Sequence, residues 1–463
     1  MIPVNLENIA GVTGGKVIQG HFKTVFNAVS TDSRTLKRGQ LFIALRGETY
    51  DGHNFLEKAV GAGAGGLVVS HLADLPQHIP VVLVNDTLQA LQSLAAYNRI
   101  RISAFLVGVT GSTGKTTTKD ILASVLATRL VTHKTSGNYN NEVGLPHTLL
   151  QMGHDCQAAV VEMAMRGAGE IDSLCRIAKP DCAVITTINE THMELLGDLS
   201  SIAAAKGEIL AHIPPEGFAL LPAESPFIKR EAARCKGRVI FFGTSGDADI
   251  RAENIRPTSR GSSFDVVIGG RRDRYTLPIP GRHNVVNALA AIGVGREMGL
   301  TTAEIARGLE AVDLTGMRLE ITSAGGIKII NDSYNASPAS TRAALQTLVD
   351  IAAGGRKIAV LGDMLELGQR ALSGHREVGA AATGLQIDYL ITVGELAQNI
   401  QRGAHRAGMD QERALHCQDN QEAVKILENL LQPGDTVLVK GSRGMKMESI
   451  VQSLVKSQAG MQE

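Results

Sequence analysis

An alternation of short apolar runs with amphipathic stretches constrains the fold of this chain more than any other feature. Seven apolar runs are each long enough for one buried strand: 104–110, 158–164, 182–188, 238–243, 357–363, 389–394 and 436–442. Helical patterns separate several of these runs, and between 118 and 129 the apolar residues recur on one helical face. Because parallel strands need long crossovers, this alternation predicts an α/β fold with parallel sheets.

The length and the changes of pattern along the chain predict three domains. A chain of 463 residues corresponds to roughly three domains of about 150 residues each. Residues 1–84 hold short strands and glycine-rich turns, which predicts a small α+β domain. Residues 85–314 are expected to form a central parallel α/β domain around a phosphate loop, and residues 315–463 a C-terminal Rossmann-like α/β domain.

The charge and the composition exclude several classes of partner. Lys plus Arg and Asp plus Glu both number 46, and the chain has 6 Tyr, 10 Phe and no Trp, which argues against a nucleic-acid partner. Five cysteines without a CxxC pair indicate a reducing compartment and no zinc site. No apolar run reaches 18 residues and no signal peptide is evident, so we expect a cytoplasmic protein without membrane insertion.

The strongest local motif is GSTGKTT at 111–117, which follows an apolar run and opens a helical pattern. This is the context of a nucleotide-binding phosphate loop, in which backbone N–H groups surround the phosphates. We expect Lys115 to reach the outer phosphates and Thr116 to offer its hydroxyl to Mg²⁺. The standard motif has glycine at the position of Val109, so the loop is a variant. The expected nucleotide ligands here are Gly111, Ser112, Thr113, Gly114, Lys115, Thr116 and Thr117.

Two candidate metal ligands follow neighbouring apolar runs. Glu162 ends the segment AAVVE within the run at 158–164 and His192 lies shortly after the run at 182–188, so both are expected at the sheet edge that carries Lys115. With Thr116 they form an oxygen and nitrogen set that suits Mg²⁺. Glu162 as a helix cap and His192 as a loop histidine are the alternatives. By its spacing alone, Lys206 is a solvated helix lysine.

Eight segments occur in the order in which they occur in the Mur ligase family, which the chain resembles from about Ile9 to Glu448. The segments are GSTGKTTTKD, KTSGNYNNEVGLP, EMAMRGAGEI, INETHMELLGDLSSIAAAKGEIL, GRHNVVNALAA, NDSYNASPAS, LGDMLELG and VLVKGSRGMKME. The segment TDSRTLKRGQLFIALRGETYDGHNF is similar to the UDP-sugar-binding domain of two branches of that family. NDSYNASP, together with the lack of a DNPR-type segment, favours the D-alanyl-D-alanine-adding branch.

The resemblance implies an ATP-dependent carboxylate–amine ligase that makes the pentapeptide precursor in the last cytoplasmic step of its synthesis. In that branch, ATP phosphorylates the terminal carboxylate of UDP-N-acetylmuramoyl-tripeptide, and the amine of D-Ala-D-Ala attacks the acyl phosphate. The implied cofactors are ATP and two Mg²⁺ ions. Glu162 matches the glutamate on the first ion, and His192 the histidine on the second. Lys206 matches a lysine that is carbamylated in several members and contributes to the second site.

The resemblance also assigns the other ligand contacts. Adenine and ribose contacts fall on Asn284, Asn287, Asp332, Tyr334 and Asn335, and a phosphate contact on Arg318. The uridine diphosphate pocket and the peptide path match Ser33, Arg34, Asp51, Gly52, His53, Asn138 and Asn141. A basic turn that could bind a carboxylate or a phosphate holds Lys440, Gly441, Ser442 and Arg443, with an ordinary surface turn as the alternative.

ATP is expected between the second and third domains, so we also expect an open arrangement without ligands. Nothing in the sequence requires a second copy of the chain, so we expect a monomer. Another amino-acid ligase of the family is the closest alternative function, and a phosphate-loop ATPase switch is more distant, because switches usually carry Asp where this chain has Glu162.

Overall fold

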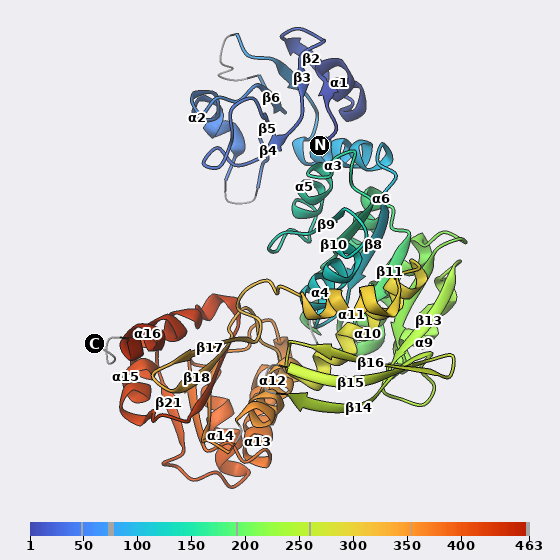
Figure 1. The fold of residues 1–463 in the computed structure, drawn as a ribbon. Coiled ribbons are helices and arrows are strands. Elements are labelled where there is room, and N and C mark those ends of the chain that lie inside the picture. The colour runs from blue at the N-terminus through green and yellow to red at the C-terminus, as the bar shows by residue number, and fades with distance from the viewer. Residues whose placement is uncertain (48–49, 73–77, 191–192, 259–260, 353, 460–463) are drawn as a thin grey trace.

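The computed structural model describes residues 1–47, 50–72, 78–190, 193–258, 261–352 and 354–459. Three lobes follow one another along the chain, each with a sheet of its own (Figure 1). Strands are mostly parallel within each main sheet, which confirms the predicted three-part α/β fold. Within these ranges, no helix is both long enough and apolar enough to cross a bilayer.

The first lobe is a five-stranded sheet in the order β2-β7-β6-β5-β4, with a separate β1-β3 pair. Only β2 is antiparallel to its neighbour in the larger sheet. Its elements are β1 (Val4–Asn5), α1 (Leu6–Thr13), β2 (Lys16–Gln19), β3 (Val25–Phe26), β4 (Val29–Ser30), β5 (Leu41–Ile43), α2 (Leu56–Gly61), β6 (Gly66–Val69) and β7 (Val81–Leu83).

The middle lobe is a nine-stranded sheet in the order β16-β15-β14-β13-β12-β11-β8-β10-β9. The strands from β9 to β14 are parallel, and β14, β15 and β16 form an antiparallel extension that the sequence analysis did not predict. Its strands are β8 (Phe105–Thr110), β9 (Thr132–Lys134), β10 (Ala158–Glu162), β11 (Cys182–Ile185), β12 (Phe218–Pro222), β13 (Arg238–Gly243), β14 (Ile250–Thr258), β15 (Gly261–Ile268) and β16 (Arg271–Leu277).

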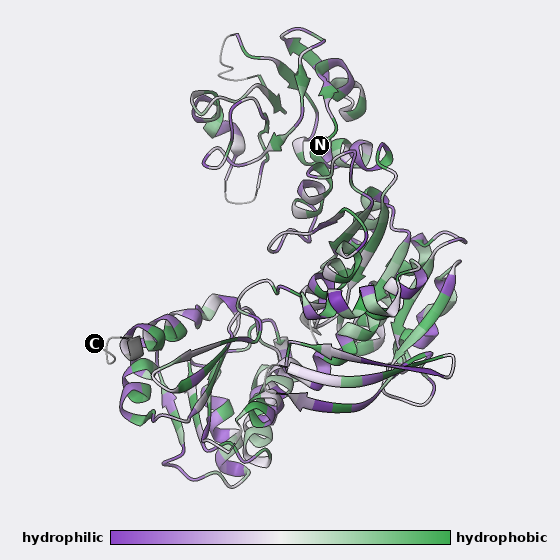
Figure 2. Ribbon diagram, viewed as in Figure 1, coloured by the Kyte–Doolittle hydropathy of each residue, from purple (hydrophilic) through white to green (hydrophobic). Residues whose placement is uncertain are grey.

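Helices cover both faces of the middle sheet, and apolar side chains fill both interfaces. Figure 2 shows the inner strands of the lobes as largely hydrophobic and the outer helix faces as mixed. The helices are α3 (Thr87–Ile100), α4 (Lys115–Ala127), α5 (Gly144–Leu150), α6 (Glu170–Ala178), α7 (Met193–Leu196), α8 (Leu199–Lys206), α9 (Pro226–Glu231), α10 (Arg282–Glu297) and α11 (Thr302–Glu310).

The third lobe is a six-stranded sheet in the order β17-β18-β22-β19-β20-β21, with only β17 antiparallel. Two apolar clusters pack on its two faces. Its elements are β17 (Glu320–Ala324), β18 (Ile327–Asp332), α12 (Pro338–Ile351), β19 (Lys357–Gly362), α13 (Ala371–Gly384), β20 (Tyr389–Val393), α14 (Gln398–Arg406), β21 (Ala414–Cys417), α15 (Asn420–Leu430), β22 (Thr436–Lys440) and α16 (Glu448–Ala459).

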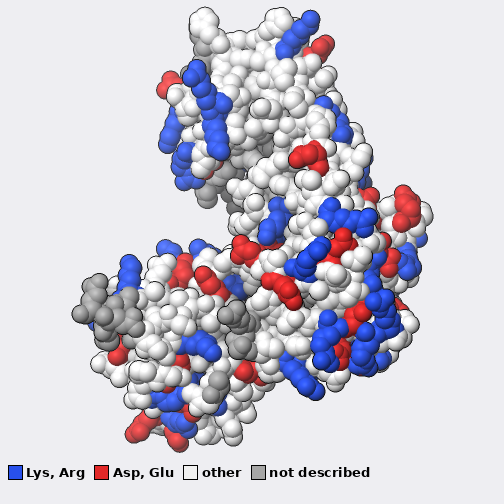
Figure 3. All heavy atoms as spheres, viewed as in Figure 1, with Lys and Arg blue, Asp and Glu red and all other residues white. Residues whose placement is uncertain are grey.

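The surface carries both signs of charge in close alternation. Figure 3 shows acidic and basic groups interspersed over the visible face of the middle lobe. On the β14–β16 extension, Arg274 pairs with Asp265 at 2.8 Å and Arg272 with Glu253 at 2.6 Å. Neighbouring charges therefore offset one another on this extension.

Candidate active site

The phosphate loop lies between β8 and α4, at the carboxyl end of the middle sheet. Gly111 and Gly114 both have positive φ, 144° and 82°, and a Cβ on Gly111 would lie 2.0 Å from Thr186 Oγ1. Glycine is therefore required where the loop passes the end of β11. Lys115 Nζ donates to Gly111 O at 2.8 Å, which folds the ammonium back over the loop. Burial lowers the pKa of Lys115, while the carboxylate of Glu162 opposes that shift.

The segment after β11 fixes the shape of the loop. Ser112 N–H donates to Thr187 O at 2.8 Å, and the Ser112 hydroxyl donates to Asn189 O at 3.0 Å. Thr113 N–H donates to Thr187 Oγ1 at 3.1 Å, and Thr113 O accepts from Thr186 Oγ1 at 2.6 Å. Thr117 is buried in the first turn of α4. These contacts preform the loop, so a nucleotide would meet an ordered site.

Glu162 stands at the end of β10, where the sequence analysis expected a metal ligand. Its two carboxylate oxygens accept from Thr116 Oγ1 and from Asn140 Nδ2, both at 2.8 Å. Its own N–H donates to Thr135 Oγ1 at 3.0 Å. The structure therefore brings Glu162 and Thr116 together as adjacent oxygen donors beside the phosphate loop. Such hard donors suit Mg²⁺.

Lys206, at the end of α8, is 1% exposed, which excludes the solvated lysine that its spacing suggested. Its side-chain nitrogen makes no hydrogen bond or ion pair with any residue the structure describes. Burial, with the charge of Lys115 as a second cause, holds the pKa of Lys206 well below its ordinary value. Both effects favour the uncharged form of the amine. His192 lies outside the described residues, and the described part of the chain holds no cluster of three or more metal-ligating side chains.

The asparagines at the start of α10 face the phosphate loop. Asn287 Nδ2 donates to Asn284 Oδ1 at 3.2 Å, and Asn284 Nδ2 donates to Pro280 O at 2.8 Å. A Cβ on Gly114 would lie 2.6 Å from Asn287 Oδ1, so the two segments are in close contact. Both asparagines are buried. The structure therefore places these candidate adenine contacts next to the candidate phosphate site.

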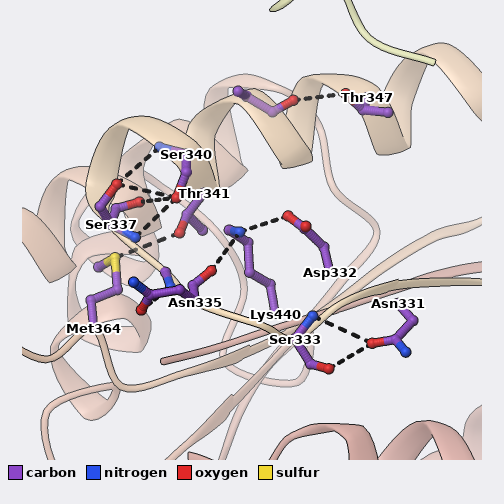
Figure 4. A network of polar contacts seen from close by, with 12 residues as sticks. Asn331, Asp332, Ser333, Asn335, Ser337, Ser340, Thr341, Thr347, Met364 and Lys440 are labelled. Carbon is purple, nitrogen blue, oxygen red and sulfur yellow. Dashed lines mark hydrogen bonds and ion pairs between the residues drawn. The ribbon is translucent and has the colours of Figure 1, made fainter. Parts of the chain in front are cut away.

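The third lobe contributes residues at the carboxyl ends of β18 and β22. Lys440 Nζ donates to Asp332 Oδ2 at 2.6 Å and to Asn335 O at 2.9 Å (Figure 4). The Arg318 guanidinium lies 4.1 Å from the centre of the Tyr334 ring, and its Nε is buried with no acceptor among the described residues. Arg318 also lowers the pKa of Lys115, a smaller effect than burial, so the two cations lie near each other. An unpartnered guanidinium N–H beside the loop suits a phosphate oxygen.

The middle and third lobes are in contact, and the open arrangement expected without ligands stays a prediction. Arg370, before α13, forms an ion pair with Glu190, which follows β11. His283 in α10 has a pKa lowered to about 4 by burial, and Asp332 and Lys440 also influence it. A Cβ on Gly281 would lie 2.7 Å from Thr347 Oγ1 of α12.

The candidate anion-binding turn after β22 does not converge on one point. Lys440 is paired with Asp332, as described above. Ser442 is buried, and its hydroxyl oxygen accepts from Leu365 N–H at 2.9 Å. Arg443 donates to Glu448 at 2.9 Å. In this arrangement the three side chains serve separate partners, so anion binding here stays a prediction.

The candidate uridine pocket is organised around His53. Asp51 caps the turn of Gly52–Phe55 and accepts from His53 Nδ1 at 2.6 Å, while His53 Nε2 accepts from Ser70 N–H at 2.9 Å. A Cβ on Gly52 would lie 2.7 Å from Leu45 O, so this turn needs glycine.

Two further candidates in the first lobe are neighbours in sequence but differ in exposure. Ser33 is buried. Arg34 is largely exposed and pairs with Asp32 at 2.7 Å, which lowers the pKa of Asp32 to about 2. The guanidinium is therefore at the surface, where a ligand could reach it.

The asparagine loop before α5 holds a residue that the sequence analysis missed. Asn138 is exposed, and Asn141 Oδ1 accepts from Gly144 N–H at 2.9 Å at the start of α5. Asn140, between them, is the one that contacts Glu162. The cluster of three asparagines at 138–141 signalled the loop but not which member points into the site.

Comparison with family models covers most of the chain. The Mur ligase middle domain matches residues 109–295, the glutamate ligase domain of Mur ligases matches 317–443, and the Mur ligase family catalytic domain matches 25–99. A Bacillus subtilis protein named UDP-N-acetylmuramoyl-tripeptide--D-alanyl-D-alanine ligase is 40% identical over 460 residues, 99% of each chain. This chain belongs to the Mur ligase family. An Escherichia coli protein of the same name is 35% identical to this Mur ligase and covers 98% of it.

Solved structures agree with that membership. A crystal structure of MurF from Acinetobacter baumannii superposes with a TM-score of 0.90 at 32% identity, covering 98% of this Mur ligase and 99% of that chain. A MurF ligase from Thermotoga maritima, solved in complex with ADP, gives a TM-score of 0.83 at 28% identity over 94% and 98% of the two chains. The likeness therefore extends over all three lobes.

Proposed function

We propose that this chain is an ATP-dependent ligase that joins D-alanyl-D-alanine to UDP-N-acetylmuramoyl-tripeptide. The observation that carries the proposal is the preformed phosphate loop with the Thr116–Glu162 oxygen pair beside it, at the junction with the third lobe. The names of the full-length relatives supply the substrates. The reaction completes the peptide of a peptidoglycan precursor, and we place it in the cytoplasm, where ATP is available.

The chemistry proceeds in two steps. An oxygen of the tripeptide's terminal carboxylate attacks the γ-phosphorus of ATP, giving an acyl phosphate and ADP. The free amine of D-Ala-D-Ala then attacks the acyl carbon, and inorganic phosphate leaves as the amide forms and the amine loses its proton. A carboxylate is a poor electrophile, and phosphorylation supplies the leaving group. In the first step a carboxylate approaches a triphosphate, and both are anions. Neutralising their charge therefore contributes more to catalysis than a covalent intermediate with the protein would.

The residues of the loop would position and neutralise the triphosphate. The N–H groups of Ser112 and Thr113 already donate to Thr187, so those at the start of α4 would face the phosphates, and Lys115 would move from Gly111 O to the transferred phosphoryl group. Glu162 and Thr116 would hold one Mg²⁺, and His192 with Lys206 a second. Such ions offset the charge that develops on phosphoryl oxygens.

Lys206 fits the second ion only after a change of charge, because an ammonium cannot ligate a cation. Its burial without a partner favours the neutral amine, which can attack CO₂ and lose a proton to give a carbamate. The carbamate oxygens would then be ligands of the same kind as Glu162. We therefore propose that Lys206 is carbamylated in the active enzyme.

The remaining contacts divide between the lobes. Asn284 and Asn287 would bind adenine through amide groups that can both donate and accept. Asp332 would bind the ribose hydroxyls, Tyr334 and Asn335 would flank the base, and Arg318 would contact the phosphates. The UDP end would lie near Ser33, Arg34, Asp51, Gly52 and His53, and the peptide near Asn138 and Asn141. Lys440, Ser442 and Arg443 would serve the dipeptide end. All these residues come from one chain, so a monomer suffices.

The direct test measures ADP release with ATP, Mg²⁺ and each substrate in turn. We expect release at a sustained rate only when UDP-N-acetylmuramoyl-tripeptide and D-Ala-D-Ala are both present. Release that is indifferent to both would support the phosphate-loop ATPase alternative. Sustained release with a single amino acid in place of the dipeptide would support another amino-acid ligase of the family.

A further inference from the structure

Helix α4 carries a buried pair of opposite charges that has no role in the reaction proposed above. Lys119 and Asp120 lie one turn after Lys115, with exposures of 0% and 1%. The distance between Lys119 Nζ and Asp120 Oδ1 is 3.2 Å. A buried ion pair is often no more stabilising than apolar residues of the same volume. Its contacts, rather than its contribution to stability, therefore indicate its role.

Asp120 connects α4 to the linker between the middle and third lobes. Its Oδ2 accepts from Thr315 N–H at 2.9 Å, and its Oδ1 accepts from Lys134 Nζ at 2.7 Å. Burial opposes ionisation of Asp120, but the charge of Lys119 and the bond from Lys134 outweigh it and keep the pKa of Asp120 below its ordinary value. The carboxylate is thus a charged acceptor, which makes its bond to the Thr315 amide strong.

Lys119 connects the same linker to the candidate metal ligand. Its Nζ donates to Thr135 O at 2.9 Å and lies 3.4 Å from Thr315 Oγ1. Thr135 is fully buried, and its hydroxyl oxygen accepts from Glu162 N–H. One buried cluster therefore joins the phosphate-loop helix, the strand end that carries Glu162, and Thr315 of the linker.

The linker comprises residues 311–319, between α11 and β17 (Figure 1). It is anchored to the third lobe at Met317, only two residues after Thr315. Met317 O accepts from Tyr334 N–H at 3.2 Å, and Leu319 is buried in the core of the third lobe. Met317 and Leu319 both have positive φ, 63° and 51°, which is unusual for such side chains and indicates that the surrounding structure imposes the conformation.

Gly316 is the single residue between the two anchors. It is exposed, makes no hydrogen bond with any residue the structure describes, and has open space where a Cβ would stand. Arg318, the candidate phosphate contact from the third lobe, follows two residues later. The position of Arg318 relative to Lys115 is therefore set by how Thr315 is held on α4.

We propose that Lys119 and Asp120 are positioning residues of the ligase reaction, which clamp Thr315 to the phosphate-loop helix so that the linker turns at Gly316 and presents Arg318 to the phosphates. The proposal rests on the proposed function for its kinetic consequence. Its structural consequence, a linker held against α4, is independent of the substrates.

The test compares Asp120→Asn and Thr315→Val with Ser124→Ala. Asp120→Asn removes the charge that orders the cluster, and Thr315→Val removes the hydroxyl near Lys119 while keeping the amide. Ser124→Ala is the matched control, because Ser124 lies on the same helix and donates to Gly308 O at 2.7 Å within the middle lobe. Thr315→Val keeps the test informative if Asp120→Asn does not fold.

We expect kcat to fall about tenfold in Asp120→Asn and severalfold in Thr315→Val, since small displacements of a phosphate contact are costly. The Kd of UDP-N-acetylmuramoyl-tripeptide should stay within twofold. Hydrogen exchange of the 311–319 amides in the free protein should accelerate at least tenfold in Asp120→Asn. Ser124→Ala should change neither kcat nor the hydrogen exchange of the linker. Thr315→Ser, which keeps the hydroxyl, should have the parental kcat.

Folded variants with parental kcat and parental linker exchange would overturn the proposal, as would an equal loss in Ser124→Ala. A loss of kcat without faster linker exchange would also overturn it, because the cluster would then act by another route. Failure of the parent chain to form the amide would count against the proposed function instead. The exchange measurement would still decide whether the clamp exists.

Discussion

The carboxyl ends of the middle and third sheets both gather charged side chains, but the lysines at the two edges differ in their hydrogen-bond partners. In the middle lobe, Lys115 donates only to a backbone carbonyl, and Lys206 has no partner among the described residues. In the third lobe, Lys440 is held by Asp332 and by Asn335 O. Lys115 thus leaves the first edge with a positive charge available for a ligand, whereas the charge of Lys440 at the second edge is already neutralised.

The difference indicates a division of labour between the two lobes. Charge that is free to meet an anion lies where phosphoryl transfer is proposed, and the third lobe adds Arg318, whose Nε–H has no acceptor among the described residues. The Lys440–Asp332 pair instead fixes the geometry of a carboxylate proposed to bind ribose. Substitutions at the middle edge should therefore affect kcat, and those at the third edge mainly affect nucleotide affinity.

The largest expected effect is that of Lys115→Ala. Removing the cation that neutralises the transferred phosphoryl group should lower kcat for ADP release by about 10³-fold. The circular dichroism spectrum should not change, because Gly111 O is the side chain's one hydrogen-bond partner among the described residues. A loss confined to the KM of the tripeptide would contradict the role given to Lys115.

The next effect is that of Lys206→Met, which removes the amine but keeps the volume. We expect about a 10²-fold loss of kcat if a carbamate serves the second ion. Parent activity should fall when bicarbonate and CO₂ are removed, and ¹³C-labelled bicarbonate should give a carbamate resonance that the variant lacks. A plain amine together with full activity of Lys206→Met would rule out this role.

Lys440→Met should have a smaller effect of a different kind. Without its partner, Asp332 becomes an uncompensated charge near the proposed ribose site, so the KM of ATP should rise about tenfold while kcat changes less. Steady-state kinetics at saturating tripeptide and dipeptide measure the two constants. An effect on kcat as large as that of Lys115→Ala would abolish the distinction between the two edges.

The smallest effect concerns the interface between the two lobes. His283 has a pKa of about 4 in the folded protein against about 6.5 when unfolded, so the unfolded chain binds more protons between these values. Stability is therefore lost as pH falls through 6.5, by about 0.7 kcal/mol between pH 7 and pH 6. Asp332, Lys440 and Asp350 are the charged groups that influence this histidine.

The measurement for His283 is the apparent melting temperature at the two pH values. In His283→Gln the decrease on acidification should be smaller than in the parent. Equal decreases in the two proteins would show that His283 is already solvated and free to take up a proton in the folded state.

The sequence predicted those parts of the site that depend on local pattern. The run at 104–110 followed by GSTGKTT placed the phosphate loop, and Glu162 was expected at a strand end because an apolar run stops there. Parallel strands then bring Glu162 and Thr116 together through sheet geometry alone. These inferences need only the pattern of apolar residues along the sequence and the parallel direction of the strands.

Other parts depend on packing that no local pattern encodes. Lys206 follows a run of small residues that is equally compatible with a surface helix, and only the fold buries it. Lys119 and Asp120 resemble solvated helix charges until Thr315, 195 residues further along, is placed beside them. Among three neighbouring asparagines, the loop's conformation selects Asn140 for Glu162.

The transfer of oxygen from substrate to phosphate tests the central claim most directly. The terminal carboxylate of UDP-N-acetylmuramoyl-tripeptide would be labelled with ¹⁸O and converted with ATP, Mg²⁺ and D-Ala-D-Ala. If the phosphate loop delivers the γ-phosphoryl group to that carboxylate, each amide formed leaves one ¹⁸O in inorganic phosphate, and Lys115→Ala forms neither product. Amide formation with unlabelled phosphate would contradict the acyl phosphate and the role assigned to the site.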